Sequence, residues 1–230
     1  MQEKNIGLLE YDHRFKIILK GNENAGKSCI IKSFIEDIFL EKHDRTIGVD
    51  FNATNLIVNN EKVKLQIWDS SGDKQYKEIS SEFNRGAHIG LFVYDVTDRA
   101  SFDDIESFIK EFADNDHVIK VVVGNKIDDV ENRSVSYAEA KELAEKLGCS
   151  FIEVSAKTGQ NINELFQKAT SEKLTYLTSI SREKKEENTN LPRDAERIPR
   201  KVISNYPSSF LNFSSMQQTD TNQVQGCTIF

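Results

Sequence analysis

Apolar positions along this chain follow two alternating spacings, one typical of strands and one typical of helices, from Arg14 to about Thr178. Two strand-like runs, 89–95 and 118–125, are almost wholly apolar, as expected for strands buried on both faces. The segment 100–112 places its apolar residues three and four positions apart, which is typical of one helix face. The pattern predicts strands at 15–20, 51–58, 63–69, 89–95 and 118–125, a strand and loop at 150–157, and helices at 29–39, 100–112, 137–148 and 162–174.

The order of these elements predicts an α/β fold. Segments 51–58 and 63–69 flank a polar stretch and are typical of a hairpin, so one edge strand should be antiparallel. Elsewhere strands alternate with helices, and such crossovers are right-handed and make neighbouring strands parallel. We therefore expect a mainly parallel six-stranded sheet with one antiparallel edge strand and helices on both faces.

The character of the sequence changes after about Thr178. All three prolines of the chain, Pro192, Pro199 and Pro207, lie beyond that point among Ser, Asn, Gln and charged residues. Such a composition does not bury enough apolar surface to offset the entropy of ordering it. Residues 179–226 are therefore predicted to be a flexible tether.

Composition and charge narrow the class of protein. The chain has 230 residues, 38% hydrophobic and 29% charged, which suits one globular domain with an extension. A formal charge of −7 gives no basic excess for binding nucleic acid. Three scattered cysteines, Cys29, Cys149 and Cys227, indicate a reducing compartment. The sequence has neither a signal-peptide pattern nor an apolar run long enough to span a bilayer, so we expect a protein on the cytosolic side.

Residues 21–28, GNENAGKS, have the spacing of a phosphate-binding loop and lie between a predicted strand and a predicted helix. Gly21 and Gly26 allow the backbone to curl so that several N–H groups point inward, where the helix dipole also favours an anion. Lys27 is expected to reach the terminal phosphates of a nucleotide, and the Ser28 hydroxyl to bind Mg²⁺. The alternative is a chance glycine turn, which the flanking strand and helix disfavour.

Two further motifs indicate the base of the nucleotide. In Asn125-Lys126-Ile127-Asp128 the aspartate can accept hydrogen bonds from the N1–H and 2-amino groups of guanine, which adenine does not offer. In Ser155-Ala156-Lys157 a backbone N–H can donate to guanine O6. Both motifs follow predicted strands, and open α/β sheets bind ligands at the carboxyl ends of their strands. Each of these short motifs alone is better explained as a solvated polar loop, but all three motifs in this order favour a guanine nucleotide.

With these motifs, the segment from about 14 to 178 resembles a small GTPase of the Ras superfamily. Three stretches resemble its Rab branch: Thr46-Ile47-Gly48-Val49-Asp50-Phe51, Lys64-Leu65-Gln66-Ile67-Trp68-Asp69 and Leu91-Phe92-Val93-Tyr94-Asp95. The stretch Asn84-Arg85-Gly86-Ala87 departs slightly, with Phe83-Asn84 where Rabs usually have paired tyrosines. The resemblance implies a P-loop NTPase fold of the small G domain type at 14–178, between a short extension at 1–13 and a hypervariable tail at 179–230.

The resemblance also implies roles for single residues. Thr46 is expected to bind Mg²⁺ and the γ-phosphate, Asp69 to hold a Mg²⁺-bound water, and the Gly72 N–H to contact the γ-phosphate. Phe39 falls where the family packs an aromatic edge against guanine, with a core phenylalanine as the alternative. Phe51 and Trp68 match a Rab surface read by effectors, with core packing as the alternative for Trp68. The predicted nucleotide contacts are Glu23, Asn24, Ala25, Gly26, Lys27, Ser28, Cys29, Phe39, Thr46, Gly72, Asn125, Lys126, Asp128, Ser155, Ala156 and Lys157, with Ser28, Thr46 and Asp69 at the metal.

Two residues depart from the family pattern where GTP is hydrolysed. Glu23 stands beside the expected γ-phosphate position, where Ras has glycine and Rabs usually have a small residue. Asp73 replaces the glutamine that orients the attacking water in the family. With Thr46 and Gly72 as the other catalytic residues, we expect GTP binding that survives, slow hydrolysis and impaired activation by a partner's arginine. The alternative is that Glu23 points outward and a partner supplies its own glutamine.

The last four residues, Cys227-Thr228-Ile229-Phe230, fit a prenylation box, and the terminal Phe favours a geranylgeranyl chain. Acidic neighbours nearly cancel the basic residues of the tail, so we do not expect a polybasic patch. The protein is expected to be a monomer, attached reversibly to the cytosolic face of an intracellular membrane through Cys227. Its implied partners are a guanine nucleotide exchange factor, a GTPase-activating protein, a GDP dissociation inhibitor or escort protein, and effectors on the switch surface.

The sequence leaves three hypotheses for the function of this chain. The leading hypothesis is a Rab-like GTP/GDP switch in vesicle traffic, in which GTP orders residues around 41–50 and 70–80. The second is a nucleotide-locked module that docks effectors with negligible hydrolysis. The third is an ATP-dependent P-loop enzyme, which Asp128 disfavours. Single-turnover GTP hydrolysis separates the first two, and competition between ATP and GTP tests the third.

Overall fold

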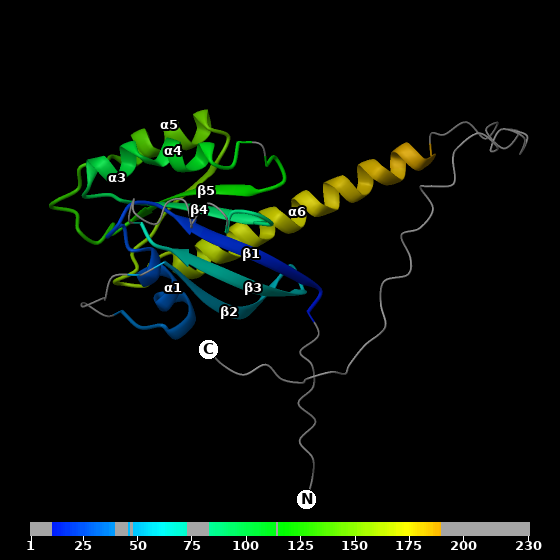
Figure 1. Cartoon of the computed structure of the whole chain (residues 1–230), viewed down its shortest axis with the longest axis horizontal. Helices are drawn as coiled ribbons and strands as arrows, with labels where there is room; N and C mark the ends of the chain where they lie inside the picture. Colours follow the sequence, from blue (N-terminus) through cyan, green and yellow to red (C-terminus); the bar gives the residue numbers. More distant parts are fainter. Residues whose placement is uncertain (1–10, 40–45, 47, 73–82, 114, 190–230) are drawn as a thin grey trace, which may run out of the picture. The chain divides into compact units, whose positions relative to one another are not determined.

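The computed structural model describes residues 11–39, 46, 48–72, 83–113 and 115–189 of the chain. They include a six-stranded sheet with the strand order β2-β3-β1-β4-β5-β6 (Figure 1). The strands are β1 (His13–Lys20), β2 (Val49–Val58), β3 (Glu61–Ser70), β4 (Ile89–Asp95), β5 (Ile119–Asn125) and β6 (Ser150–Glu153). The helices are α1 (Lys27–Glu36), α3 (Arg99–Asp103), α4 (Ile105–Lys110), α5 (Tyr137–Lys146) and α6 (Ile162–Thr189).

The register of the sheet confirms the expected fold. β2 runs antiparallel to β3, and every other pair of neighbouring strands is parallel. The hairpin turn is shorter than the predicted polar stretch, because β3 already begins at Glu61. Asn59 and Asn60 form this turn with φ of 54° and 66°, a left-handed conformation that asparagine tolerates and that matches the twist of the strands. The sheet is thus mainly parallel, with one antiparallel edge strand.

The helix predicted at 100–112 is two short helices, α3 and α4, that meet at Asp104. The Asp104 carbonyl accepts the Ser107 N–H at 3.0 Å and the Ser107 hydroxyl at 2.7 Å. Bonds from residue i to i+3 tighten a helical turn and interrupt the regular α-helical ladder. Hydrophobic spacing alone therefore located the buried face of this segment and missed its break.

The last helix is longer than predicted, because α6 ends at Thr189 and includes residues 179–189 of the expected tether. Its extension is free of Gly and Pro and rich in Lys, Arg and Glu, which are good helix formers. The Thr178 and Ser181 hydroxyls donate to carbonyls one turn earlier. Residues 190–230, with Cys227, lie outside the described part of the chain. In the described part, no helix is long and apolar enough to cross a bilayer.

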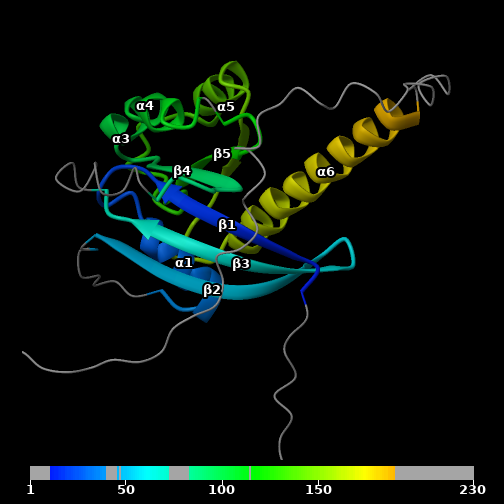
Figure 2. The same cartoon turned by 45° about the vertical axis from the view of Figure 1, so that its right-hand side comes forward.

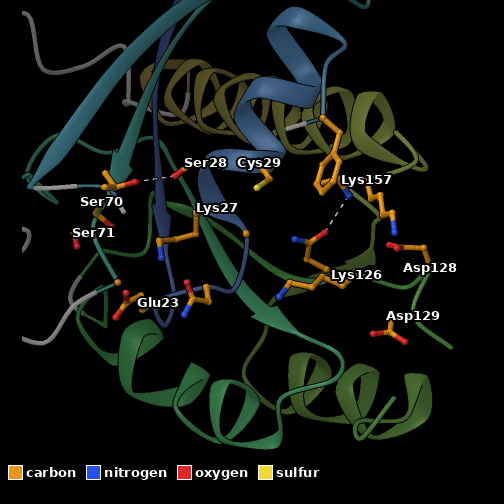
Figure 3. Close-up of a pocket in the computed structure, with 17 residues that line it drawn as sticks. Glu23, Lys27, Ser28, Cys29, Ser70, Ser71, Lys126, Asp128, Asp129 and Lys157 are labelled. Carbon is orange, nitrogen blue, oxygen red and sulfur yellow. Dashed lines mark hydrogen bonds between the residues drawn. The ribbon is translucent and has the colours of Figure 1, made fainter. Parts of the chain in front are cut away.

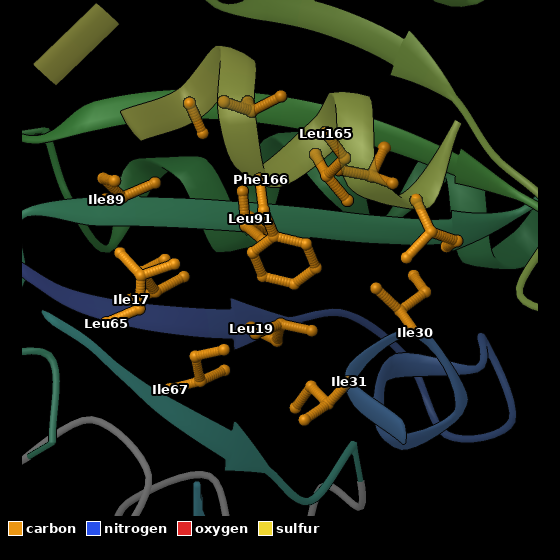
Figure 4. Close-up of a cluster of buried hydrophobic side chains, with 14 of the residues drawn as sticks. Ile17, Leu19, Ile30, Ile31, Leu65, Ile67, Ile89, Leu91, Leu165 and Phe166 are labelled. Atoms are coloured by element: carbon orange, nitrogen blue, oxygen red, sulfur yellow. The ribbon is translucent and has the colours of Figure 1, made fainter. Parts of the chain in front are cut away.

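Both faces of the sheet are covered by helices, as Figure 2 shows from a second direction. Leu19 and Ile67 point toward α1 and α6, where they pack with Ile30 and Phe166 (Figure 4). The opposite face packs against α3, α4 and α5, through Phe92, Tyr94, Phe102, Ile105, Ala140 and Ala144. Alternate residues of one strand serve opposite faces, since the side-chain period of a strand is two. The carboxyl ends of the five parallel strands are thereby held at one edge of the sheet.

Candidate functional site

A cavity of about 690 Å³ opens at the carboxyl edge of the sheet. Figure 3 shows Ser70, Ser71, Glu23, Lys27 and Ser28 at one end, and Lys126, Asp128, Asp129 and Lys157 at the other. The lining is formed by Glu23, Asn24, Gly26, Lys27, Ser28, Cys29, Phe39, Thr46, Ser70, Ser71, Gly72, Asn125, Lys126, Asp128, Asp129, Ala156 and Lys157. Of the predicted nucleotide contacts, only Ala25 and Ser155 are not part of the lining; both are buried directly behind it.

The loop 21–28 wraps around the side chain of Lys27. The Lys27 Nζ donates to the carbonyls of Gly21 and Asn22, each at 2.9 Å. Burial lowers the pKa of Lys27 to about 8, with the charges of Asp69 and Glu23 raising it and that of Lys20 lowering it. No side chain in the described residues caps the N-terminus of α1. Its first residues, Lys27 and Ser28, line the cavity, and the N–H groups and dipole of a helix N-terminus favour an anion.

Glycines are required where this loop meets its neighbours. A Cβ on Gly26, whose φ is 89°, would lie 2.2 Å from the Asn125 amide nitrogen. A Cβ on Gly72 would lie 2.3 Å from the Glu23 backbone nitrogen. The chain therefore makes close approaches at both glycines, and any side chain at either one would displace a part of the cavity wall.

Three predicted metal residues lie together near Lys27 and the loop 21–28. We call this end of the cavity the phosphate end, after the role expected for the loop. The Ser28 hydroxyl is 2.9 Å from the Thr46 hydroxyl and also donates to a carboxylate oxygen of Asp69. Such oxygen donors fit Mg²⁺, which keeps several waters and shares substrate phosphates instead of needing a full protein cage. The described residues hold no cluster of three or more His, Cys, Asp or Glu side chains suited to a metal.

Asn125, at the end of β5, joins the loops on which the guanine motifs depend. Its Nδ2 donates to the Ala25 carbonyl at 2.9 Å, and its Oδ1 accepts the Ala156 N–H at 3.1 Å. Beside it, Asp128 accepts the Ser155 hydroxyl at 2.5 Å. Ala25 and Ser155 therefore brace the wall, and the three sequence motifs meet as one connected unit.

Glu23, the residue out of place in a phosphate loop, lies on the wall of the phosphate end. It is half-buried and close enough to Lys27 for its charge to raise the pKa of that lysine. The structure thus places a carboxylate beside the cation expected to bind the terminal phosphates. Asp73, the second unusual residue, lies outside the described residues.

Comparison with known proteins agrees with this geometry. Residues 16–175 match the model of the Ras family. The chain belongs to the Ras family. It is 42% identical over 159 residues to the Ras-related protein RIC1 of Oryza sativa subsp. japonica, an alignment that covers 68% of this chain and 79% of the relative. It is 41% identical over 159 residues to the Ras-related protein RABD2a of Arabidopsis thaliana, with 68% and 78% covered. The Ras-related protein Rab-1 of Theileria annulata is 36% identical over 217 residues, with 93% and 89% covered.

The chain is therefore a Rab-like small GTPase, and Rab proteins are GTP/GDP switches of vesicle traffic. Phe39, in the position expected to flank guanine, is 36% exposed and lines the cavity, so the alternative of a core phenylalanine is wrong. Cys29 also lines the cavity, and burial raises the pKa of its thiol.

This Rab-like GTPase carries an aromatic cluster, formed by Phe51, Trp68 and Phe83, beside the sheet edge. The Trp68 ring centroid is 5.0 Å from that of Phe51 and 5.3 Å from that of Phe83. Phe51 is 47% exposed, whereas Trp68 is half-buried and packs against the core under α3–α5. Trp68 thus packs on the core with one side and adjoins an exposed ring with the other, whereas its recognition by effectors stays a prediction. The Lys16 ammonium lies over the Trp68 ring, 4.8 Å from its centroid.

Three polar residues that line the cavity, Ser70, Ser71 and Asp129, escaped the sequence reasoning, as did several ion pairs and hydrogen bonds next to the cavity. Lys126 pairs with Asp95 at 2.5 Å, and Asn22 donates to Asp104 at 2.9 Å. Lys20, the last residue of β1, is 2% exposed and pairs with Glu111 at 3.3 Å. A lysine at the end of the apolar run 15–20 was the available signal, because a buried cation needs a partner.

Proposed function

We propose that this Rab-like GTPase binds GTP or GDP with Mg²⁺ in the cavity and hydrolyses GTP slowly. The observation that carries the proposal is the connected wall of the cavity, in which Asn125 ties the phosphate loop to the loop after β6. The proposal is supported by the positions of Lys27 and Asp128 toward opposite ends of one cavity, with Glu23 near Lys27.

Each end of the cavity has a binding task. The Asp128 carboxylate accepts hydrogen bonds from guanine, and Phe39 supplies an aromatic edge to the base. Lys27 and the N-terminus of α1 bind the phosphates. Ser28 and Thr46 would hold Mg²⁺, with Asp69 acting through a bound water. When bound, the ion supplies positive charge that offsets the charge of the phosphates. These attractions outweigh one flexible carboxylate at Glu23, so GTP binding is retained.

Hydrolysis depends on tighter geometry than binding does, and two residues work against it. An ionised Asp73 is one methylene shorter than glutamine and has no hydrogen to donate, so it orients an attacking water poorly. Glu23 is bulky and negative, which obstructs and neutralises an arginine offered by a partner. Such an arginine accelerates hydrolysis by about 10³–10⁵ in related enzymes. We therefore expect slow intrinsic hydrolysis and a weak response to conventional activation.

Single-turnover hydrolysis of loaded GTP tests this proposal. The unaltered protein is compared with Asp73→Gln, with the double variant Glu23→Ser and Asp73→Gln, and with Glu145→Ser, a matched change of a carboxylate that is 67% exposed on α5. The double variant should be faster by about tenfold or more, since each factor of ten needs only about 1.4 kcal/mol of barrier. Equal rates in the unaltered protein and the double variant would contradict the proposal. Hydrolysis in neither would favour the nucleotide-locked module.

Competition binding tests the base specificity separately. Equal displacement of bound GDP by ATP and GTP would overturn the guanine site itself.

Membrane attachment and partners complete the proposal. A prenyl group on Cys227 would anchor the protein reversibly to the cytosolic face of an intracellular membrane, because one lipid chain without a basic patch holds weakly. Escort by a GDP dissociation inhibitor fits such an anchor. An exchange factor and a GTPase-activating protein would act at the cavity, and effectors would bind a monomer at the aromatic cluster.

A further inference from the structure

A buried ion pair lies directly beneath the phosphate loop, outside the residues assigned to the nucleotide. The Lys20 side chain is 3% exposed, and its ammonium lies 3.3 Å from a carboxylate oxygen of Glu111, whose side chain is 17% exposed. Taking both charges out of water costs several kcal/mol per ion in proteins, so a buried ion pair is weak evidence for stability. Stability alone therefore does not account for a charged pair at this position.

The position of the pair ties the phosphate loop to α4. Lys20 and Asn22 flank Gly21, whose carbonyl accepts the Lys27 ammonium at 2.9 Å. Lys20 pairs with Glu111, the C-cap of α4, and Asn22 donates to Asp104, the N-cap of α4, at 2.9 Å. Both ends of one short helix are therefore attached to the residues on either side of the carbonyl that holds Lys27.

The Glu111 carboxylate also connects to the aromatic cluster. The oxygen of Glu111 that pairs with Lys20 also accepts the Asn84 amide at 3.2 Å. Asn84 directly follows Phe83, whose ring packs on Trp68. Lys16 makes a second connection between Trp68 and the segment that follows Phe83. Its ammonium lies over the Trp68 ring and donates to the Arg85 carbonyl at 3.0 Å.

We propose that Lys20 is a positioning residue that couples the terminal phosphate end of the cavity to the aromatic cluster through Glu111 and Asn84. A γ-phosphate held by Lys27 adds negative charge next to Gly21 and attracts the Lys20 ammonium. That attraction competes with Glu111, so the carboxylate and the Asn84 amide bound to it shift with the nucleotide. The aromatic cluster thereby responds to the bound nucleotide through the charge of Lys20, which an apolar residue at this position would lack. This inference rests on the proposed binding of guanine nucleotides.

Trp68 is the only tryptophan of the chain, so its fluorescence reports on the aromatic cluster. The signal is compared between the full-length protein loaded with GDP and with the non-hydrolysable analogue guanosine 5′-[β,γ-imido]triphosphate, both with Mg²⁺. The variants are Lys20→Met, Glu111→Gln and the two combined. Lys110→Met is the matched control, because Lys110 is 70% exposed at the end of the same helix and pairs only along it with Glu106 in the described contacts. Urea unfolding and nucleotide affinity are measured for each protein.

Lys20→Met and the double variant should each lose about half or more of the fluorescence difference between the two nucleotides, whereas Lys110→Met keeps it. The double variant separates coupling from stability. Replacing both charges of a buried pair by neutral groups restores the free energy of unfolding that a single replacement lowers. Recovery of both stability and the full fluorescence difference in the double variant overturns the inference, since the pair is then only structural. An absent fluorescence difference in the unaltered, nucleotide-bound protein overturns it as well. Failure to bind either nucleotide refutes the proposed function, and is seen directly in the affinities.

Discussion

Replacing Asn125 by alanine tests whether the wall of the cavity is held together by a single amide. Asn125 is 1% exposed, and its two partners, Ala25 and Ala156, are 1% and 3% exposed. The change removes the hydrogen bonds of 2.9 Å to the Ala25 carbonyl and 3.1 Å from the Ala156 N–H. It thereby leaves a buried acceptor and a buried donor without these bonds.

Each buried group left unsatisfied costs about 1–3 kcal/mol, so Asn125→Ala should lower the free energy of unfolding by about 2–6 kcal/mol. That is a large part of the roughly 5–15 kcal/mol of a typical domain. The same loops form the nucleotide site, so the GDP affinity should fall by about tenfold or more, a change worth roughly 1.4 kcal/mol.

Urea unfolding at a fixed excess of GDP and Mg²⁺ measures the stability, and displacement of a fluorescent GDP analogue measures the affinity. Asn132→Ala is the matched control, because Asn132 is exposed and its amide bonds only to the Asp129 carboxylate, at 2.9 and 3.1 Å, in the described contacts. The control should change stability by less than about 0.5 kcal/mol. If Asn125→Ala matches the control in both assays, the amide does not hold the site together and the reasoning is refuted.

Three further changes test other parts of the molecule. Asp128→Asn should shift nucleotide preference from guanine toward xanthine, whose 2-oxo group suits an amide donor; an unchanged preference in competition binding contradicts this. Cys227→Ser should leave the protein in the cytosolic fraction with GDP binding intact, and continued sedimentation with membranes would count against the lipid anchor. His88 accepts the Lys16 N–H on Nδ1 at 3.0 Å, and burial lowers its pKa. The contribution of His88 to the free energy of unfolding is therefore full above the ordinary histidine pKa of about 6.5. It is lost as the pH falls through the lowered pKa of the folded protein. His88→Asn should flatten this acid loss of stability in urea unfolding, and equal pH slopes would exclude His88 as its cause.

The expected fold was recoverable from sequence because its signals are local. The runs that became β4 and β5 are nearly all apolar and are bounded by polar residues, so the burial of most of their positions on both faces was evident. Boundaries were less predictable. Apolar spacing is indifferent to a hydroxyl that competes for a carbonyl, so the break at Asp104 between α3 and α4 was missed. It is also blind to a polar helix that continues past its last packed turn, as α6 does up to Thr189.

By itself, the sequence determined the motifs that are expected to read a guanine nucleotide, because each motif is contiguous and each follows a strand of the same sheet. Only the tertiary structure decided how these motifs are joined. The Asn125 amide reaches Ala25, 100 positions away, because β1 and β5 end at the same edge. The Lys20 ammonium meets Glu111 because α4 packs over the sheet, and the placing of Glu23 beside Lys27 depends on the curl of the loop. Periodicity reports which face of an element is buried, whereas the partner of a buried charge is fixed only when distant elements pack together.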